Sequence, residues 1–121
     1  LDGLTYELRI NFDLLREGGV AIDEVRAVGG GARSALWLQL KADILGLPIL
    51  VPAVTESACW GAALLAGVGA GLFADAAAAA GALLRLERRF EPDTRRAARY
   101  LERYQLYREL YPALRGIQER M

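Results

Sequence analysis

A triple glycine interrupts the chain in the stretch Val25-Arg26-Ala27-Val28-Gly29-Gly30-Gly31-Ala32-Arg33-Ser34. A short β-prone run enters the glycines, and a helical pattern that Ser34 can cap follows them. Three successive glycines remove every Cβ from the turn, so a ligand or another backbone can approach it closely. The helix that follows directs its free N–H groups and the positive end of its dipole at the turn. The stretch therefore predicts a strand, a bare turn and a helix N-terminus that together suit a phosphate or a nucleotide.

The residues on either side of this turn predict an α/β fold. We expect, in order, a helix over 2–17, a strand over 24–28, a helix over 34–45, a strand over 49–51 and a helix over 56–68. The second strand is apolar on both faces, which is typical of a buried parallel strand. The helix before it should bury the stripe Leu36, Leu40 and Ile44. Residues 24–51 are thus predicted to form a βαβ unit with flanking helices.

The second half of the chain predicts further helices and one ambiguous segment. Small residues at Gly61, Ala62 and Ala63 indicate that a neighbouring element packs closely there. An alanine-rich run over 74–82 predicts a short helix, and residues 84–90 predict a strand or an extended connector. A long last helix should begin at Pro92-Asp93 and carry tyrosines along one side, which we expect to pack into a core. These are Tyr100, Tyr104, Tyr107 and Tyr111.

The composition excludes several classes of function. The formal net charge is zero, so no global field attracts nucleic acid or an anionic membrane surface. The chain has no histidine, which excludes a Ser-His-Asp triad and most zinc sites, and we predict no metal ligands. The one cysteine, Cys59, lies in an apolar helical context and is expected to be a buried structural thiol.

Length and composition also bear on domain organisation. The 121 residues are 54% hydrophobic and 25% charged, which is typical of one folded domain with a real core. The sequence shows neither a signal peptide nor an apolar span of membrane length, so we expect a cytoplasmic protein. The chain begins with Leu1-Asp2-Gly3, and we expect it to be a piece of a longer protein.

The residues of the turn allow more than one interpretation. Gly29, Gly31 and Ser34 mimic a dinucleotide fingerprint, but that fingerprint needs an acid at the end of the next strand, and here the next acid is Glu56 beyond Pro52. A P-loop is excluded because no Gly-Lys-Ser/Thr follows the glycines. A turn that serves only chain reversal remains an alternative, although one glycine would suffice for it.

A family resemblance favours a nucleotide site. The glycine motif, followed by Trp37, Gln39, Ala42-Asp43 and Gly46, resembles the adenosine-binding motif of FGGY-family carbohydrate kinases, and xylulose kinases are the most similar members. The resemblance continues through residues 56–66 and the glycines after them, and it resumes at 90–92 and 100–111. It therefore covers nearly the whole chain and is specific for the family, but not for the sugar.

The resemblance implies a partial ribonuclease-H-like domain of the actin and hexokinase type. Residues 1–121 would be the C-terminal fragment of its second, nucleotide-binding domain. The glycine turn would lie against the adenosine and the inner phosphates of ATP, with Gly31 as the first choice for contact. The implied cofactor-binding residues are Gly29, Gly30, Gly31, Ala32, Ser34, Ala35 and Gln39. Related glycerol kinases have asparagine in place of Ala35, so we expect no side-chain hydrogen bond to adenine there. Gln39 and Asp43 have an alternative reading as surface or helix-packing polar groups.

The implied reaction is phosphoryl transfer from ATP, with Mg²⁺, to a sugar hydroxyl in the full-length parent. Xylulose is the favoured sugar, and ribulose and glycerol are the alternatives. In this family the aspartate base and the sugar pocket lie upstream, so we predict no catalytic residue in this chain and an inactive isolated fragment. The alternative is a function of another class, a non-catalytic helical interaction or regulatory module, and the tyrosine-lined last helix is the feature that supports it. Sheet edges left without their strands should make the fragment self-associate as a homo-oligomer.

Overall fold

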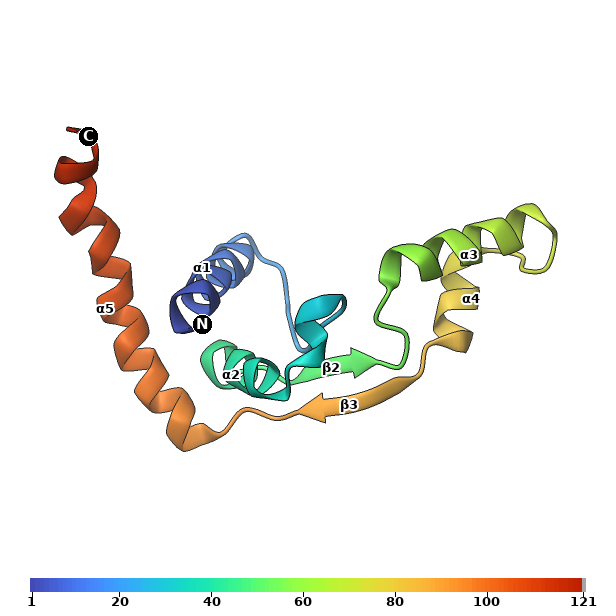
Figure 1. Ribbon diagram of the computed structural model, residues 1–121, viewed down its shortest axis with the longest axis horizontal. Helices are drawn as coiled ribbons and strands as arrows, with labels where there is room; N and C mark the ends of the chain where they lie inside the picture. Colours follow the sequence, from blue (N-terminus) through green and yellow to red (C-terminus); the bar gives the residue numbers. More distant parts are fainter. Residues whose placement is uncertain (121) are drawn as a thin grey trace.

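A computed structural model describes residues 1–120 of the chain. Its elements are α1 (Asp2–Glu17), β1 (Val25–Arg26), a 3₁₀ turn η1 (Gly30–Arg33), α2 (Ala35–Leu45), β2 (Ile49–Pro52), α3 (Ser57–Gly69), α4 (Ala76–Leu83), β3 (Leu86–Phe90) and α5 (Thr94–Gln118). Figure 1 shows α1, α2 and α5 gathered at one end of the sheet, with α3 and α4 extending beyond the other end. The predicted α/β class, with a βαβ unit and a long C-terminal helix, is confirmed.

The sheet has three strands in the order β1-β2-β3. β1 pairs with β2 in parallel, with Val25 opposite Ile49, while β3 pairs with the other edge of β2 in the antiparallel sense, with Phe90 opposite Ile49. β2 is buried along its whole length, as its apolar sequence predicts. The segment over 84–90, which the sequence left open, contains a strand because its backbone pairs with β2.

β1 is shorter than the predicted strand over 24–28. One further ladder bond, from the Ala27 N–H to the Leu50 carbonyl at 2.8 Å, follows its last residue. Beyond that bond the chain leaves β2, and the Gly29 N–H donates instead to the Thr55 carbonyl at 2.8 Å. This early departure lifts the glycines away from the sheet at the carboxyl end of β1.

Two apolar clusters lie on different sides of α2. One packs α2 on the sheet and contains Ala32, Leu38, Ala42, Leu45, Leu47, Ile49 and Val51. The other joins α2 to α1 and α5 and contains Tyr6, Leu40, Ile44 and Tyr104. The predicted stripe is right for Leu40 and Ile44 and wrong for Leu36, which is 75% exposed. Nothing else in the described part of the chain covers that side of the first turn of α2.

The caps of α2 lie where the sequence predicts them. Ser34 Oγ accepts a hydrogen bond from the Trp37 N–H at 3.3 Å, which satisfies one of the free donors at the helix N-terminus. Gly46 ends the helix in the left-handed conformation, with φ of 65°, which glycine adopts without steric cost. These caps fix where α2 begins relative to the glycine turn.

α3 and α4 leave much apolar surface in solvent. A Cβ on Gly67 would lie 2.6 Å from the Phe73 ring, so one small residue of α3 does allow a close approach. Ala62 and Ala63 are exposed, and the prediction of close packing at these two alanines is wrong for residues 1–120 because no element of that range covers them. Cys59 is also exposed, so the predicted buried thiol is wrong. No helix within residues 1–120 combines the length and the apolarity needed to cross a membrane.

The tyrosines of α5 pack into the core only in the first half of the helix. Tyr104 is buried and donates its hydroxyl hydrogen bond to Asp13 Oδ2 at 2.7 Å, and the half-buried Tyr107 donates to Glu7 at 2.7 Å. Tyr111 is exposed, which corrects the predicted core position, because α5 continues past α1 into solvent (Figure 1). The first half of α5 is therefore the part that docks.

The Tyr104–Asp13 contact predicts a loss of stability in alkali. Burial, assisted by the hydrogen bond to Asp13, raises the pKa of Tyr104 from 10.0 to about 12. Between these values the unfolded chain has released the proton and the folded chain still holds it, so the free energy of unfolding falls as pH rises through this window. Urea unfolding on both sides of the window should show the fall, and Tyr104→Phe should reduce it. An equal fall in that variant would contradict the assignment.

Candidate functional site

Gly29 opens the turn in a conformation that only glycine adopts readily. Its φ is 72° and its ψ is −167°, and its N–H donates to Thr55, which lies just past the end of β2. Its carbonyl accepts from the Ala32 N–H at 3.0 Å, which closes the 3₁₀ turn. Gly29 therefore shapes the turn through its backbone and leaves the outer face to the next residues.

Gly30 and Gly31 differ in what lies over them. A Cβ built on Gly30 would meet nothing within 4 Å, whereas one on Gly31 would lie 3.0 Å from the Trp37 ring. Within residues 1–120 neither N–H has a hydrogen-bond acceptor. Gly30 is thus the open point of the turn, and the missing side chain of Gly31 makes room for Trp37.

Ala32 faces inward. Its side chain is 1% exposed and belongs to the cluster under α2. Its carbonyl accepts a hydrogen bond from Arg88 of β3 at 2.6 Å, so the end of the turn is tied to the sheet. Nothing in the local sequence indicates Arg88, because it lies 56 positions away along the chain.

Ser34 and Ala35 form the exposed start of α2, directly after the turn. The Ser34 side chain is engaged as the helix cap. Within the described residues the N–H groups of Ala35 and Leu36 have no acceptor. Together with those of Gly30 and Gly31, they place free donors at the turn, next to the positive end of the α2 dipole. Such an arrangement favours the binding of an anion.

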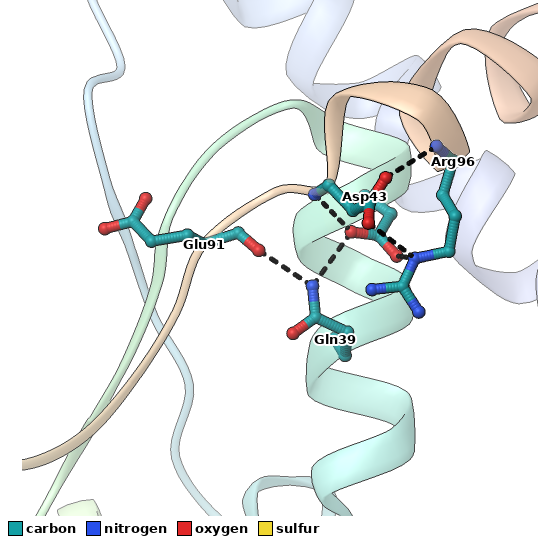
Figure 2. A network of polar contacts seen from close by, with 5 residues as sticks. Gln39, Asp43, Glu91 and Arg96 are labelled. Atoms are coloured by element: carbon teal, nitrogen blue, oxygen red, sulfur yellow. Dashed lines mark hydrogen bonds and ion pairs between the residues drawn. The ribbon is translucent and has the colours of Figure 1, made fainter.

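Gln39 lies away from the turn, in a network that joins α2 to the start of α5. Its amide nitrogen donates to Asp43 Oδ1 at 2.9 Å and to the Glu91 carbonyl at 2.7 Å. The buried Asp43 also accepts from the Asp93 N–H at 2.8 Å and pairs with Arg96 Nε at 3.0 Å. Figure 2 shows Gln39, Asp43 and Arg96 converging between the two helices. In this structure Gln39 and Asp43 act as polar groups that pack α2 against the start of α5, which is the alternative interpretation given for them from the sequence.

A cavity of about 560 Å³ lies beside the turn, at the carboxyl ends of β1 and β2. Its walls are mostly apolar and come from both strands, α3 and the segment around α4; they include Val28, Pro52, Val54, Trp60, Ala80 and Leu84. The sequence does not predict this cavity, because only folding brings these segments together. In residues 1–120 no group of three or more histidines, cysteines, aspartates or glutamates could hold a metal ion.

Comparison with known proteins gives a consistent result. The family model described as the C-terminal domain of the FGGY family of carbohydrate kinases matches residues 1–70. A glycerol kinase of Citrifermentans bemidjiense is 49% identical over 81 residues, which are 67% of this chain and 16% of that protein. The L-xylulose/3-keto-L-gulonate kinase of Escherichia coli is 34% identical over 120 residues, which are 99% of this chain and 24% of that protein.

A solved structure supports the same relationship. The xylulose kinase from Rhodospirillum rubrum matches with a TM-score of 0.79 and 28% sequence identity, over 96% of this chain and 24% of that one. The match confirms the expected fold type, a part of an actin- and hexokinase-like domain. The chain spans no more than 24% of the length of these relatives.

Proposed function

This chain belongs to the FGGY family of carbohydrate kinases, and we propose that its parent transfers a phosphoryl group from ATP to a hydroxyl of a small sugar. In this proposal residues 1–121 are the C-terminal part of the second, nucleotide-binding domain. The small share of each related kinase that the chain spans supports this reading. The rest of the cleft would then come from other parts of the parent.

The observation that carries the proposal is the open glycine turn at the carboxyl end of β1. Ligands of open α/β sheets bind at the carboxyl ends of parallel strands, and phosphates bind at helix N-termini. Here both features coincide at Gly30, whose outer face is uncovered and whose N–H is free within the described residues. ATP fits the chemistry of these donors, because its phosphates are anionic acceptors.

The residues implied by the family motif divide into two groups. Gly30, Gly31, Ser34 and Ala35 lie at the turn or at the helix start, and we propose that they contact the nucleotide, while Gly29 shapes the turn through its engaged N–H and carbonyl. Ala32 and Gln39 are occupied in contacts with β3 and with the start of α5, so we propose that they position the turn and α2 instead.

Phosphoryl transfer depends mainly on alignment and on stabilisation of charge. This segment would contribute alignment, because donors fixed by a strand and a helix hold phosphate oxygens without reorganising. A carboxylate base is also needed for the sugar hydroxyl. Asp43 is buried in the network between α2 and α5, and Asp93 caps α5, so neither is proposed as that base. We assign no step to Mg²⁺, since the described residues provide no ligand cluster for it.

We propose xylulose as the sugar, with glycerol as the alternative. The two relatives that match over nearly the whole chain are an L-xylulose/3-keto-L-gulonate kinase and a xylulose kinase. The glycerol kinase has a higher sequence identity but matches over fewer residues. Three expectations remain predictions: a cytoplasmic location, the lack of nucleic-acid and membrane partners, and self-association through exposed sheet edges.

Assays of phosphoryl transfer test the proposal. The longer protein should convert ATP and xylulose to ADP and a sugar phosphate, and the 121-residue chain should show no turnover, because it lacks the base. Glycerol and ribulose serve as comparison substrates. Turnover by the 121-residue chain alone would contradict the placement of the base, and a longer protein inactive on every sugar and polyol would contradict the kinase.

A further inference from the structure

Three arginines lie along one face of the first half of α5, at the spacing i, i+3 and i+7. Arg96, Arg99 and Arg103, together with Tyr100, line a small cavity of about 140 Å³, which we call the arginine pocket. We propose that the arginine pocket binds a phosphate group, as free phosphate or as a phosphate monoester, at a site separate from the glycine turn.

Two of the three charges in the arginine pocket are not neutralised by an ion pair within the described residues. Arg99 and Arg103 are exposed, and neither makes an ion pair in residues 1–120. Arg96 pairs with the carboxylates of Asp43 and Asp93 through its Nε. Like charges one turn apart on a helix repel each other, so an anion placed among them is stabilising.

A buried hydroxyl without a partner, that of Tyr6, belongs to the cluster against which Tyr100 of the arginine pocket packs. The Tyr6 side chain is 5% exposed, and its hydroxyl has no hydrogen bond in the described part of the chain. Burial raises the pKa of Tyr6, Asp2 and Tyr100 add to the rise, and the Arg103 charge opposes it. Buried hydroxyls are rarely left unpaired, and a bound oxyanion would supply an acceptor nearby.

The size and chemistry of the arginine pocket select the ligand. A cavity of about 140 Å³ has the volume of about four or five water molecules at about 30 Å³ each, which suits a tetrahedral oxyanion rather than a whole nucleoside. Guanidinium groups match phosphate oxygens with paired N–H donors, and they remain charged at every working pH.

The arginine pocket is distinct from the glycine turn. It is tied to α2 through Asp43, which lies eight residues after Ala35, or about 12 Å along the helix axis. The turn precedes the first residue of α2, whereas α5 meets the last turns of that helix. A ligand in the pocket would therefore act on the docking of α5, not on the nucleotide phosphates directly.

Titration of the ¹⁵N-labelled 121-residue chain with inorganic phosphate, at constant ionic strength set with sodium chloride, tests the proposal. We expect saturable shifts at Arg99, Tyr100 and Arg103. Arg99→Gln and Arg103→Gln should each weaken the affinity roughly tenfold, because each removes charged hydrogen bonds. Both side chains are exposed, so both variants should keep the amide spectrum of the folded chain.

Arg108→Gln is the matched control, since it removes the same charge from an exposed site on α5 outside the arginine pocket. It should leave the affinity unchanged. Equal weakening by all three substitutions, or shifts confined to residues 29–34, would overturn the proposal. A parallel titration with glycerol 3-phosphate separates the two sources of phosphate. Tighter binding than that of inorganic phosphate assigns the pocket to a monoester, and equal or weaker binding assigns it to free phosphate.

Discussion

Asp43→Ala should lower the free energy of unfolding by about 2–4 kcal/mol and release the start of α5. Asp43 is 2% exposed, and its two oxygens accept from the Gln39 amide, the Asp93 N–H and Arg96 Nε. Removing the carboxylate leaves the Gln39 and Asp93 donors without this acceptor and removes the partner of Arg96. The expected loss of stability is at the lower end of the range for a broken buried ion pair, because Arg96 is half exposed and its guanidinium can be hydrated. Urea unfolding measures the loss, and faster amide exchange at residues 95–98 would locate it.

Glu24→Ala provides the matched control for this prediction. Glu24 and Arg26 form an ion pair at 3.0 Å, the same distance as between Asp43 and Arg96, but both side chains are well exposed. Exposed pairs contribute about 0–1 kcal/mol, so Glu24→Ala should change stability little. If the two substitutions cost the same, the buried network would not be what holds α5 on α2.

Gly30→Val, made in the proposed full-length kinase, should raise the KM for ATP roughly tenfold or more and leave the KM for the sugar nearly unchanged. A Cβ at Gly30 meets no protein atom within 4 Å, and its φ is not in the left-handed region, so the folded chain tolerates a side chain there. The valine would occupy the space in which a phosphate meets the free N–H groups. Charged hydrogen bonds of that kind are worth about 1.5–3 kcal/mol each, which sets the scale of the effect.

Gly116→Val is the control for the added side chain, since a Cβ there also meets nothing within 4 Å and α5 is far along the chain from the turn. It should leave both KM values unchanged. Gly31→Val is a poorer probe, because its Cβ would come within 3.0 Å of Trp37 and disturb folding itself. An unchanged KM for ATP in Gly30→Val would remove Gly30 from the nucleotide site.

The sequence predicts the elements of this fold well where a local pattern decides them. Ser34 and Gly46 delimit α2 because capping depends on neighbouring residues. β2 is recognisable because residues 49–51 form an apolar run between Pro48 and Pro52. The length of β1 could not be predicted, since the strand ends where Gly29 bonds to Thr55, which belongs to another part of the chain. Leu36 and Cys59 were misplaced for a related reason: apolar character predicts burial, but burial needs a covering element, and the described residues provide none.

In the candidate site, too, features set by neighbouring residues were predictable from the sequence, and features set by distant residues were not. The triple glycine marks the turn because its chemistry is local. Which glycine is open to a ligand was not predictable, because the difference between Gly30 and Gly31 is set by how Trp37 packs. Gln39 belongs to the family motif, yet its amide bonds to a carbonyl 52 positions away. Arg88 and the cavity beside the turn had no sequence signal, since long-range contacts create them.

Amide hydrogen–deuterium exchange in the proposed full-length kinase, with and without saturating ATP, tests most directly whether the glycine turn holds the nucleotide. Phosphate oxygens that accept from the free N–H groups should slow exchange in a peptide covering residues 28–36. A peptide covering residues 109–118, at the exposed end of α5, should exchange at the same rate in both conditions. Unchanged exchange over residues 28–36 at saturating ATP, in a preparation shown to phosphorylate the sugar, would contradict the account.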